Sequence, residues 1–180
     1  MNRCLLILLI LALPCPAAAL EWQADPNDKL EVAVQQTVEL FLYQRPELGD
    51  YFDQAWGYAV FPRVLKGGAM FGAAWGKGLV IEQDRLVGRC SQFLASLGAQ
   101  LGGQSYRQVI LFRNEAAMDT FKAGRIEFEG RASVVAITAG ASVDPANLPD
   151  VAIFTLTEGG LMFEAAAAGV KYSYKPKASE

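Results

Sequence analysis

The chain has 180 residues, 52% of them hydrophobic and 19% charged, with a net charge of −3 and no histidine. Without histidine, the usual hydrolase triads, a Cys–His nucleophile and most zinc sites are excluded. The slightly acidic balance gives no overall attraction to nucleic acid or to an anionic membrane, so any such attraction must be local. The composition therefore favours a binding protein over an enzyme, with no cofactor, no metal and no nucleic-acid partner.

Residues 1–19 have the three parts of a signal peptide. Arg3 and the amino terminus supply positive charge, and an apolar run of about ten residues, CLLILLILAL, follows. Ala17 and Ala19 fit the small residues that precede a cleavage site. The run is too short to cross a bilayer, which takes roughly 20 residues. We therefore predict a cleaved chain that starts at Leu20 and is periplasmic or secreted, with a retained membrane anchor as the alternative.

The cysteines predict neither lipid attachment nor an internal disulfide. Cys15 follows Pro14, not the small residue that precedes a lipid-modified cysteine, which argues against a lipoprotein. Removal of the first 19 residues leaves Cys90 alone, so the chain cannot form an internal disulfide even in an oxidising compartment. It also removes Arg3 and leaves 15 Lys and Arg against 19 Asp and Glu. We interpret Cys90 as a small core residue.

Three helices are predicted. Asp25 is suited to cap the first, with Pro26 at its first position, and apolar residues at helical spacing follow from Leu30 to Leu42. Pro46 ends that helix and begins a second short one that runs to about Gln54. A third, internal helix is predicted over 115–122, capped by Asn114.

The middle of the chain changes to the periodicity of strands. Strands are predicted near 57–61, 68–75, 78–82, 85–90, 93–102 and 107–113. Ten of the 17 glycines lie between Gly57 and Gly103. Because glycine within a strand marks a bulge, a bend or a close approach, we predict a strongly curved antiparallel sheet, open or partly closed into a barrel. Alternatively, Gly76 and Gly78 lie in a hairpin turn around Lys77.

The C-terminal third contains further strands. They are predicted at 126–140 and, as a hairpin that turns at 158–160, between 151 and 174. Two prolines make 143–150 a loop. Residues 176–180 are predicted to be a disordered tail, so one α+β domain occupies residues 20–175.

Two patterns that suggest catalysis carry little weight. GAAWGKG at 72–78 is one residue shorter than a phosphate-binding loop, lacks the following Ser or Thr, and lies between strands. Glu127 and Glu129 alternate on one face of a predicted strand as glycosidase carboxylates can, but they lack any surrounding signature and a solvated strand face explains them better. Neither pattern predicts an active site.

Local charge is the positive signal. Arg63, Lys66 and Lys77 are the only charges in residues 55–80, and a hairpin would gather them at one edge. Such a patch suits an anionic head group, and each cation near an anionic surface contributes about 1 kcal/mol. Four aromatic residues could anchor at the polar–apolar boundary: Trp56, Tyr58, Trp75 and Tyr106. The alternative is that the cations protect strand edges from aggregation and the aromatics fill the core.

Several runs resemble the SYLF family, the lipid-binding domain shared by actin-patch and endocytic proteins and by many bacterial envelope proteins. Residues 57–62, GYAVFP, followed by Lys66-Gly67-Gly68, are similar to its VFP and K-x-G elements. Further similar runs are Phe71-Gly72, Gly76-Lys77-Gly78, Ser96–Gln104, Ala132-Ser133-Val134 and Gly159-Gly160-Leu161. The resemblance covers nearly all of the chain after residue 19.

The resemblance implies binding of acidic phospholipid through basic surface residues and no enzymatic activity. Arg63 and Lys66 occupy matching motif positions, whereas Lys77 is added from its spacing alone. Glu164 stands where the family pattern leads us to expect a small residue. Phosphoinositide specificity is not carried over, since a secreted or periplasmic protein would not meet those lipids.

The sequence thus predicts a non-enzymatic domain that binds anionic phospholipid or a membrane surface in the bacterial envelope through Arg63, Lys66 and Lys77. Two alternatives stay open. One is a structural module that holds an envelope protein partner, and the other is a carrier with an internal apolar cavity.

Overall fold

The structure is a computed structural model that describes residues 22–68, 71–97, 102–124, 149–157, 160–163 and 170–178. Its helices are α1 (Lys29–Gln44), the short 3₁₀ helix η1 (Pro46–Leu48), α2 (Gly49–Gln54) and α3 (Glu115–Lys122). Its strands are β1 (Gly57–Gly68), β2 (Phe71–Glu82), β3 (Arg85–Leu97), β4 (Gly102–Phe112), β5 (Val151–Thr157), β6 (Gly160–Phe163) and β7 (Val170–Pro176). The predicted α+β class is confirmed.

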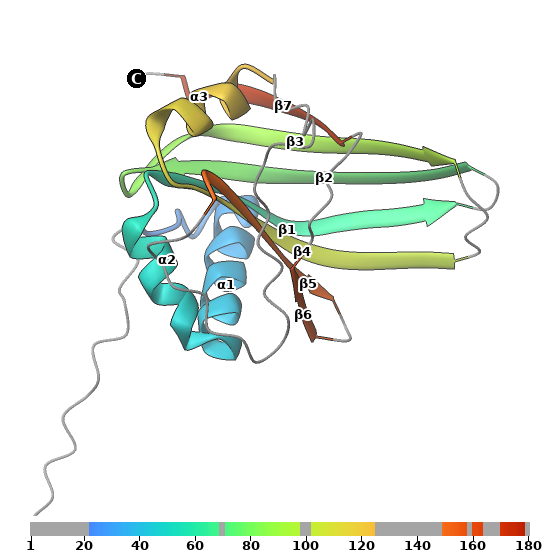
Figure 1. The fold of residues 1–180 in the computed structure, drawn as a ribbon, viewed down its shortest axis with the longest axis horizontal. Coiled ribbons are helices and arrows are strands. Elements are labelled where there is room, and N and C mark those ends of the chain that lie inside the picture. Colours follow the sequence, from blue (N-terminus) through green and yellow to red (C-terminus); the bar gives the residue numbers. More distant parts are fainter. Residues whose placement is uncertain are drawn as a thin grey trace, which may run out of the picture.

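The described strands form one antiparallel sheet in the order β6-β5-β4-β1-β2-β3-β7. Strands β6 and β7 stand at the two ends of that order, so the sheet that these strands form is open and not a closed barrel. Figure 1 shows β5 and β6 turned steeply across the direction of β2 and β3, which is the strong curvature expected from the glycines.

The first helix begins three residues later than predicted. Asp28, not Asp25, is its cap, and the Asp28 side chain accepts hydrogen bonds from the backbone N–H groups of Leu30 and Glu31. Asp25 instead closes a turn, in which its side chain accepts from the Asn27 N–H at 2.8 Å. The backbone bond from Leu30 is the largest influence that lowers the pKa of Asp28.

The other predicted helices are confirmed, and the predicted hairpin between 151 and 174 is confirmed in part. Pro46 begins η1, which leads into α2 and ends at Gln54. The Asn114 side chain caps α3 by accepting from the Ala117 N–H at 2.9 Å. Strands β5 and β6 pair with Thr157 opposite Gly160, but residues 170–174 belong to β7, which pairs with β3 at the other edge of the sheet.

The alternative in which Gly76 and Gly78 lie in a hairpin turn was wrong, because both are inside β2. A Cβ atom at Gly78 would lie 2.2 Å from the Val60 carbonyl oxygen, and one at Gly76 would lie 2.9 Å from a Val64 methyl. These glycines therefore allow β1 and β2 to approach closely without a break in pairing. For the same reason the four central strands are longer than the separate short strands that were predicted.

Pro62 lies at a bulge in the middle of β1. The register shifts between Val60 and Arg63 against β2, and between Phe61 and Val64 against β4. Proline cannot donate to a ladder, so a central strand accommodates it only at such an irregularity. The extra residue reverses the alternation of side chains in the rest of β1.

Two hydrophobic cores lie on the two faces of the sheet, and Figure 1 shows α1 and α3 on opposite sides. On the α1 face, Val34, Val38 and Phe41 pack against strand residues such as Val60 and Leu79. On the α3 face, Met118 and Phe121 pack against Phe61, Ile110 and Phe112. Among the described residues, both faces are covered only near the helices.

Some predictions lie outside the described residues. These are the signal peptide at 1–19, the strands at 126–140 with Glu127 and Glu129, most of the loop at 143–150, and Glu164.

The start of the predicted tail is held by the sheet. Pro176 pairs with Gly88, and the Lys177 N–H donates to the Val87 carbonyl at 2.8 Å, so β3 holds the chain as far as Lys177.

Candidate functional site

The four central strands continue well beyond α1 and α2, as Figure 1 shows. We call this part of the sheet the distal half: residues 63–68 of β1, 71–77 of β2, 91–97 of β3 and 102–107 of β4. The sequence has no Asp or Glu in these four segments, nor in the links that join β1 to β2 and β3 to β4. The charged side chains of the distal half are therefore all positive.

Three cations lie side by side across this half, and we call them the cation row. Arg63 is the register partner of Lys77. Arg107 lies opposite the bulge, between the pairs Phe61–Gln108 and Val64–Tyr106. All three residues are on the α1 face, since Lys77 and Arg107 alternate with the α1-face residues Leu79 and Val109, and the bulge turns Arg63 to the same side. Each of the three is exposed.

The predicted patch is thus rearranged. Arg63 and Lys77 are brought together, but Lys66 shares the α3 face with Val64 and Ala74 and is only partly exposed. Arg107, which sequence reasoning did not select, joins the other two from β4. Its strand was predicted, but its partner across the bulge depends on a register shift that the sequence does not reveal.

The cations of the row lack the acidic partners that three other cations of the described fold have. Arg45 pairs with Glu47, Arg89 with Asp28, and Lys122 with Glu82. Within the described ranges, no carboxylate lies within ion-pair distance of Arg63, Lys77 or Arg107. Their charge is therefore available to an outside anion.

A groove adjoins the row where the end of α1 meets the sheet. Its volume is about 490 Å³, within the usual range of roughly 300–1,000 Å³ for ligand sites. The lining residues are Leu40, Gln44, Pro62, Arg63, Ser105, Tyr106, Arg107, Leu156 and Thr157. Two of the three cations, with hydroxyl and amide groups nearby, thus border a hollow large enough for one head group.

A second row, of large apolar side chains, lies two residues further along the strands. Leu65 pairs with Trp75, and Trp75 pairs with Phe93. Their exposed fractions are 46%, 46% and 49%. We call these three residues the apolar row; it shares the α1 face with the cation row because the residues alternate by two. The Lys77 Nζ atom lies 5.4 Å from the centre of the Trp75 ring, which links the two rows by a cation–π contact.

The other aromatic residues predicted as interfacial anchors are used within the fold. Tyr58 is 5% exposed, and burial raises the pKa of its hydroxyl. The Trp56 Nε1 group donates to Glu82 Oε1 at 3.0 Å, and Tyr106 packs on the core of the α3 face. Of these four aromatic residues, Trp75 is therefore the one with an exposed ring that is not used within the fold.

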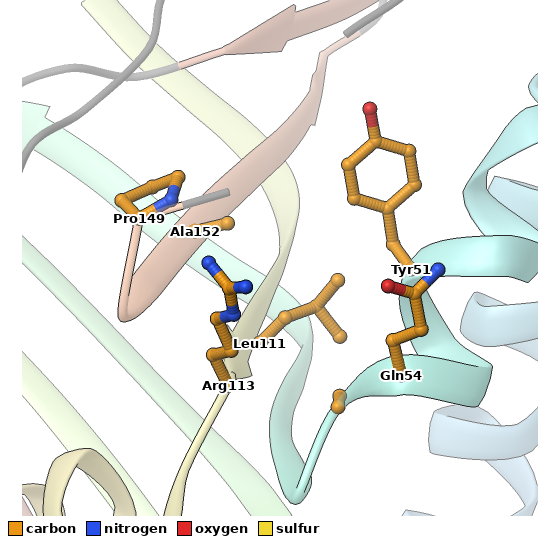
Figure 2. Close-up of a pocket in the computed structure, with 7 residues that line it drawn as sticks. Tyr51, Gln54, Leu111, Arg113, Pro149 and Ala152 are labelled. Carbon is orange, nitrogen blue, oxygen red and sulfur yellow. The ribbon is translucent and has the colours of Figure 1, made fainter. Parts of the chain in front are cut away.

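Two other places in the described part of the chain are small or inert. Figure 2 shows the side chains around a hollow between α2 and the β4–β5 pair, with Tyr51 and Gln54 on one side and Arg113 and Pro149 on the other. Its volume is about 40 Å³, which suits a few waters and not a ligand. Cys90 is buried, and that burial raises the pKa of its thiol, as expected for an unreactive core residue.

Two general properties of the described residues bear on function. None of their helices combines the length and hydropathy needed to cross a bilayer. Their His, Cys, Asp and Glu side chains do not gather in groups of three or more that could hold a metal ion.

The fold and the site define a small α+β binding domain, in which one curved antiparallel sheet presents cations and apolar side chains on its free half. Comparison with known proteins gives the family. Residues 94–176 match the family profile described as "Ysc84: Las17-binding protein actin regulator", the family also called SYLF. The resemblance drawn from the sequence motifs is confirmed. The family is associated with lipid-related or actin-related binding.

A curated relative extends the similarity. The chain is 33% identical over 160 residues to "Beta cell expansion factor A" of Aeromonas veronii. The match covers 87% of this chain and 59% of that relative, so the chain spans less than two thirds of the relative's length.

Proposed function

We propose that this protein attaches to the surface of membranes that contain anionic phospholipid, and that the cation row makes the attachment. The observation that carries the proposal is the transverse alignment of Arg107, Arg63 and Lys77 on one face, with no acidic partner among the described residues. The association of the family with lipid-related binding supports it. No catalytic step is part of this function.

The groove gives the attachment a place for one head group. Arg63 and Arg107 border it from two strands, and both guanidinium groups can bind the two oxygens of a phosphate in parallel. Ser105 and Thr157 supply hydroxyl groups at the same hollow. Lys77 stands beside the groove in the row and adds charge toward the membrane plane.

The energy available from charge alone is modest. Three cations at about 1 kcal/mol each supply about 3 kcal/mol, or a factor of about a hundred in affinity. Such an attachment is reversible and weakens with salt, because the screening length falls to about 10 Å at 0.1 M ionic strength. We place it at the bacterial envelope, since residues 1–19 have the features of a signal peptide.

Vesicle flotation with double variants of equal charge tests the proposal. Arg63→Ala/Lys77→Ala removes two cations from the row, whereas Arg63→Ala/Lys66→Ala removes one from each face of β1. We expect the first pair to weaken binding to phosphatidylglycerol vesicles about 25-fold and the second only about fivefold to tenfold. Neutral phosphatidylcholine vesicles should recover little of any variant.

Arg85→Ala is the matched control, because Arg85 is equally cationic but lies at the other end of β3, opposite Glu82. It should bind like the parent protein. Equal recovery on neutral and anionic vesicles, or equal losses for both double variants, would refute attachment through the cation row.

A further inference from the structure

Attachment through charge alone does not explain why the apolar row is exposed. Soluble proteins seldom expose three large apolar side chains on neighbouring strands. Leu65, Trp75 and Phe93 are each about half exposed and lie on adjacent strands in register. Beyond them on the same face the side chains become small, since Gly67, Ala73 and Ala95 form the next row. The face therefore passes from charged to bulky apolar to small along the strands.

We propose that the apolar row enters the boundary between lipid head groups and acyl chains while the cation row stays at the level of the phosphates. This inference rests on the proposed attachment to anionic membranes and adds its depth and orientation. Strand residues advance about 3.3 Å each, so side chains two residues further along lie roughly 7 Å deeper when the strands stand steeply to the membrane. Surface-bound apolar groups are typically buried about 5–10 Å, which matches this spacing.

The charges around the row favour a membrane over a second copy of this chain. Lys171 is the register partner of Phe93, and Lys77 lies over the Trp75 ring, so cations flank the apolar side chains. The distal half offers no carboxylate to neutralise them, and a second copy docked through the same face would bring only more positive charge. An anionic lipid surface supplies both the opposite charge and an apolar layer beneath it.

The position of Lys66 limits how the distal half can approach the membrane. It lies on the α3 face, one residue beyond Leu65 along β1. If the strands entered the membrane along its normal, the Lys66 ammonium group would lie deeper than the apolar row. A tilt that lowers the α1 face keeps the apolar row immersed and raises Lys66, on the α3 face, away from the head groups.

Trp75 itself is the reporter for the test. Trp22 is buried and Trp56 is hydrogen-bonded within the fold, so the difference in emission between the parent protein and Trp75→Phe isolates the exposed indole. The probe is vesicles of phosphatidylglycerol and phosphatidylcholine in equal parts, with bromine placed at shallow or deep positions of the phosphatidylcholine acyl chains. We expect the Trp75 emission to shift to the blue and to be quenched more strongly by shallow than by deep bromine.

Affinity supplies the second measurement. Phe93→Ala and Leu65→Ala should each weaken vesicle binding about tenfold, since roughly 55 Å² of apolar surface then stays out of the membrane. This loss should persist at high salt, unlike the loss from Arg63→Ala. Tyr43→Ala is the matched control, because Tyr43 is an aromatic on α1 that is 85% exposed and lies outside the row. It should bind like the parent protein.

The outcomes separate this inference from the proposed function. Salt-sensitive binding to the vesicles with unchanged Trp75 emission would overturn insertion and leave the cation row standing. Failure to bind anionic vesicles at all would overturn both. A Trp75 shift that follows protein concentration without vesicles would also overturn insertion, since a second copy would then occupy the row.

Discussion

The two halves of the central strands differ in what covers them, although the same four strands run through both. Near the helices, neighbouring residues such as Ala59, Val60 and Phe61 are all buried, because α1 covers one face and α3 the other. In the distal half, burial alternates, with Val64 buried and Leu65 exposed. The contrast teaches that the core and the proposed binding surface lie at opposite ends of one sheet, so that each can be altered without the other.

The largest expected difference in the free energy of unfolding comes from removing a phenylalanine ring at each end of the central strands. Phe61→Ala removes a fully buried ring and should lower the free energy of unfolding by about 4 kcal/mol. Phe93→Ala should change it by no more than about 0.5 kcal/mol, since that ring is half exposed. Chemical denaturation measures both. Comparable losses would show that the distal half belongs to the core after all.

A second test adds volume instead of removing it. Gly78→Ala places a methyl group against the Val60 carbonyl, where backbone must move, and should cost about 3 kcal/mol. Ala73→Val adds two methyl groups on the exposed face of the same strand and should stay within about 0.5 kcal/mol. A Gly78→Ala protein as stable as the parent would contradict the close approach of β1 and β2 at the bulge.

The parts of the fold that sequence predicted well are those set by local chemistry. The Asn114 cap, the helix after Pro46 and the pairing of Thr157 with Gly160 each depend on residues a few positions apart. The start of α1 was misplaced because Asp25 and Asp28 are both able to cap, and only their hydrogen bonds decide between them.

The parts that sequence missed depend on strands meeting across the sheet. A glycine that permits close approach looks the same in sequence as one that turns the chain, so the sequence left both alternatives open for Gly76 and Gly78. The bulge at Pro62 decides which face Arg63 occupies, and therefore separates it from Lys66 and joins it to Arg107. One signal was available: proline in a strand predicted to be central already requires an irregularity.

Ion pairs also distinguish the two ends of the sheet: Glu82 pairs with Lys122 at the helix-covered end, whereas the cation row has no described acidic partner. Glu82 also accepts from Trp56, and its pair with Lys122 ties β2 to α3. Burial acts to raise the pKa of Glu82, but the hydrogen bonds from Lys122 and Trp56 and the charge of Lys122 outweigh it, so the pKa is lowered. Glu82→Gln should cost about 2 kcal/mol of stability at neutral pH.

The pH dependence of that loss follows from the lowered pKa. A depressed pKa in the folded state gives stability above the unfolded-state pKa of about 4.3, which is lost as the pH falls through the lower folded-state value. The difference between the parent protein and Glu82→Gln should therefore be full at pH 7 and shrink in acid. Asp119→Asn is the control, since Asp119 is exposed and lies 4.0 Å from the same Lys122 ammonium group. A difference that stays constant from neutral to strongly acid solution would exclude the ion pair as its cause.

The smallest expected effect concerns the turn that closes the covered end between β2 and β3. Gln83 and Asp84 both have positive φ, at 46° and 58°, as a two-residue hairpin turn with the twist of its strands requires. Side chains other than glycine are strained there, although Asp tolerates this region better than most. Asp84→Gly should therefore stabilise the protein by about 0.5 kcal/mol and raise its denaturation midpoint slightly. Vesicle binding should not change, because the turn lies at the opposite end of the strands from both rows. A gain in binding together with a gain in stability would mean that the two ends of the sheet are coupled, against the separation argued from their packing.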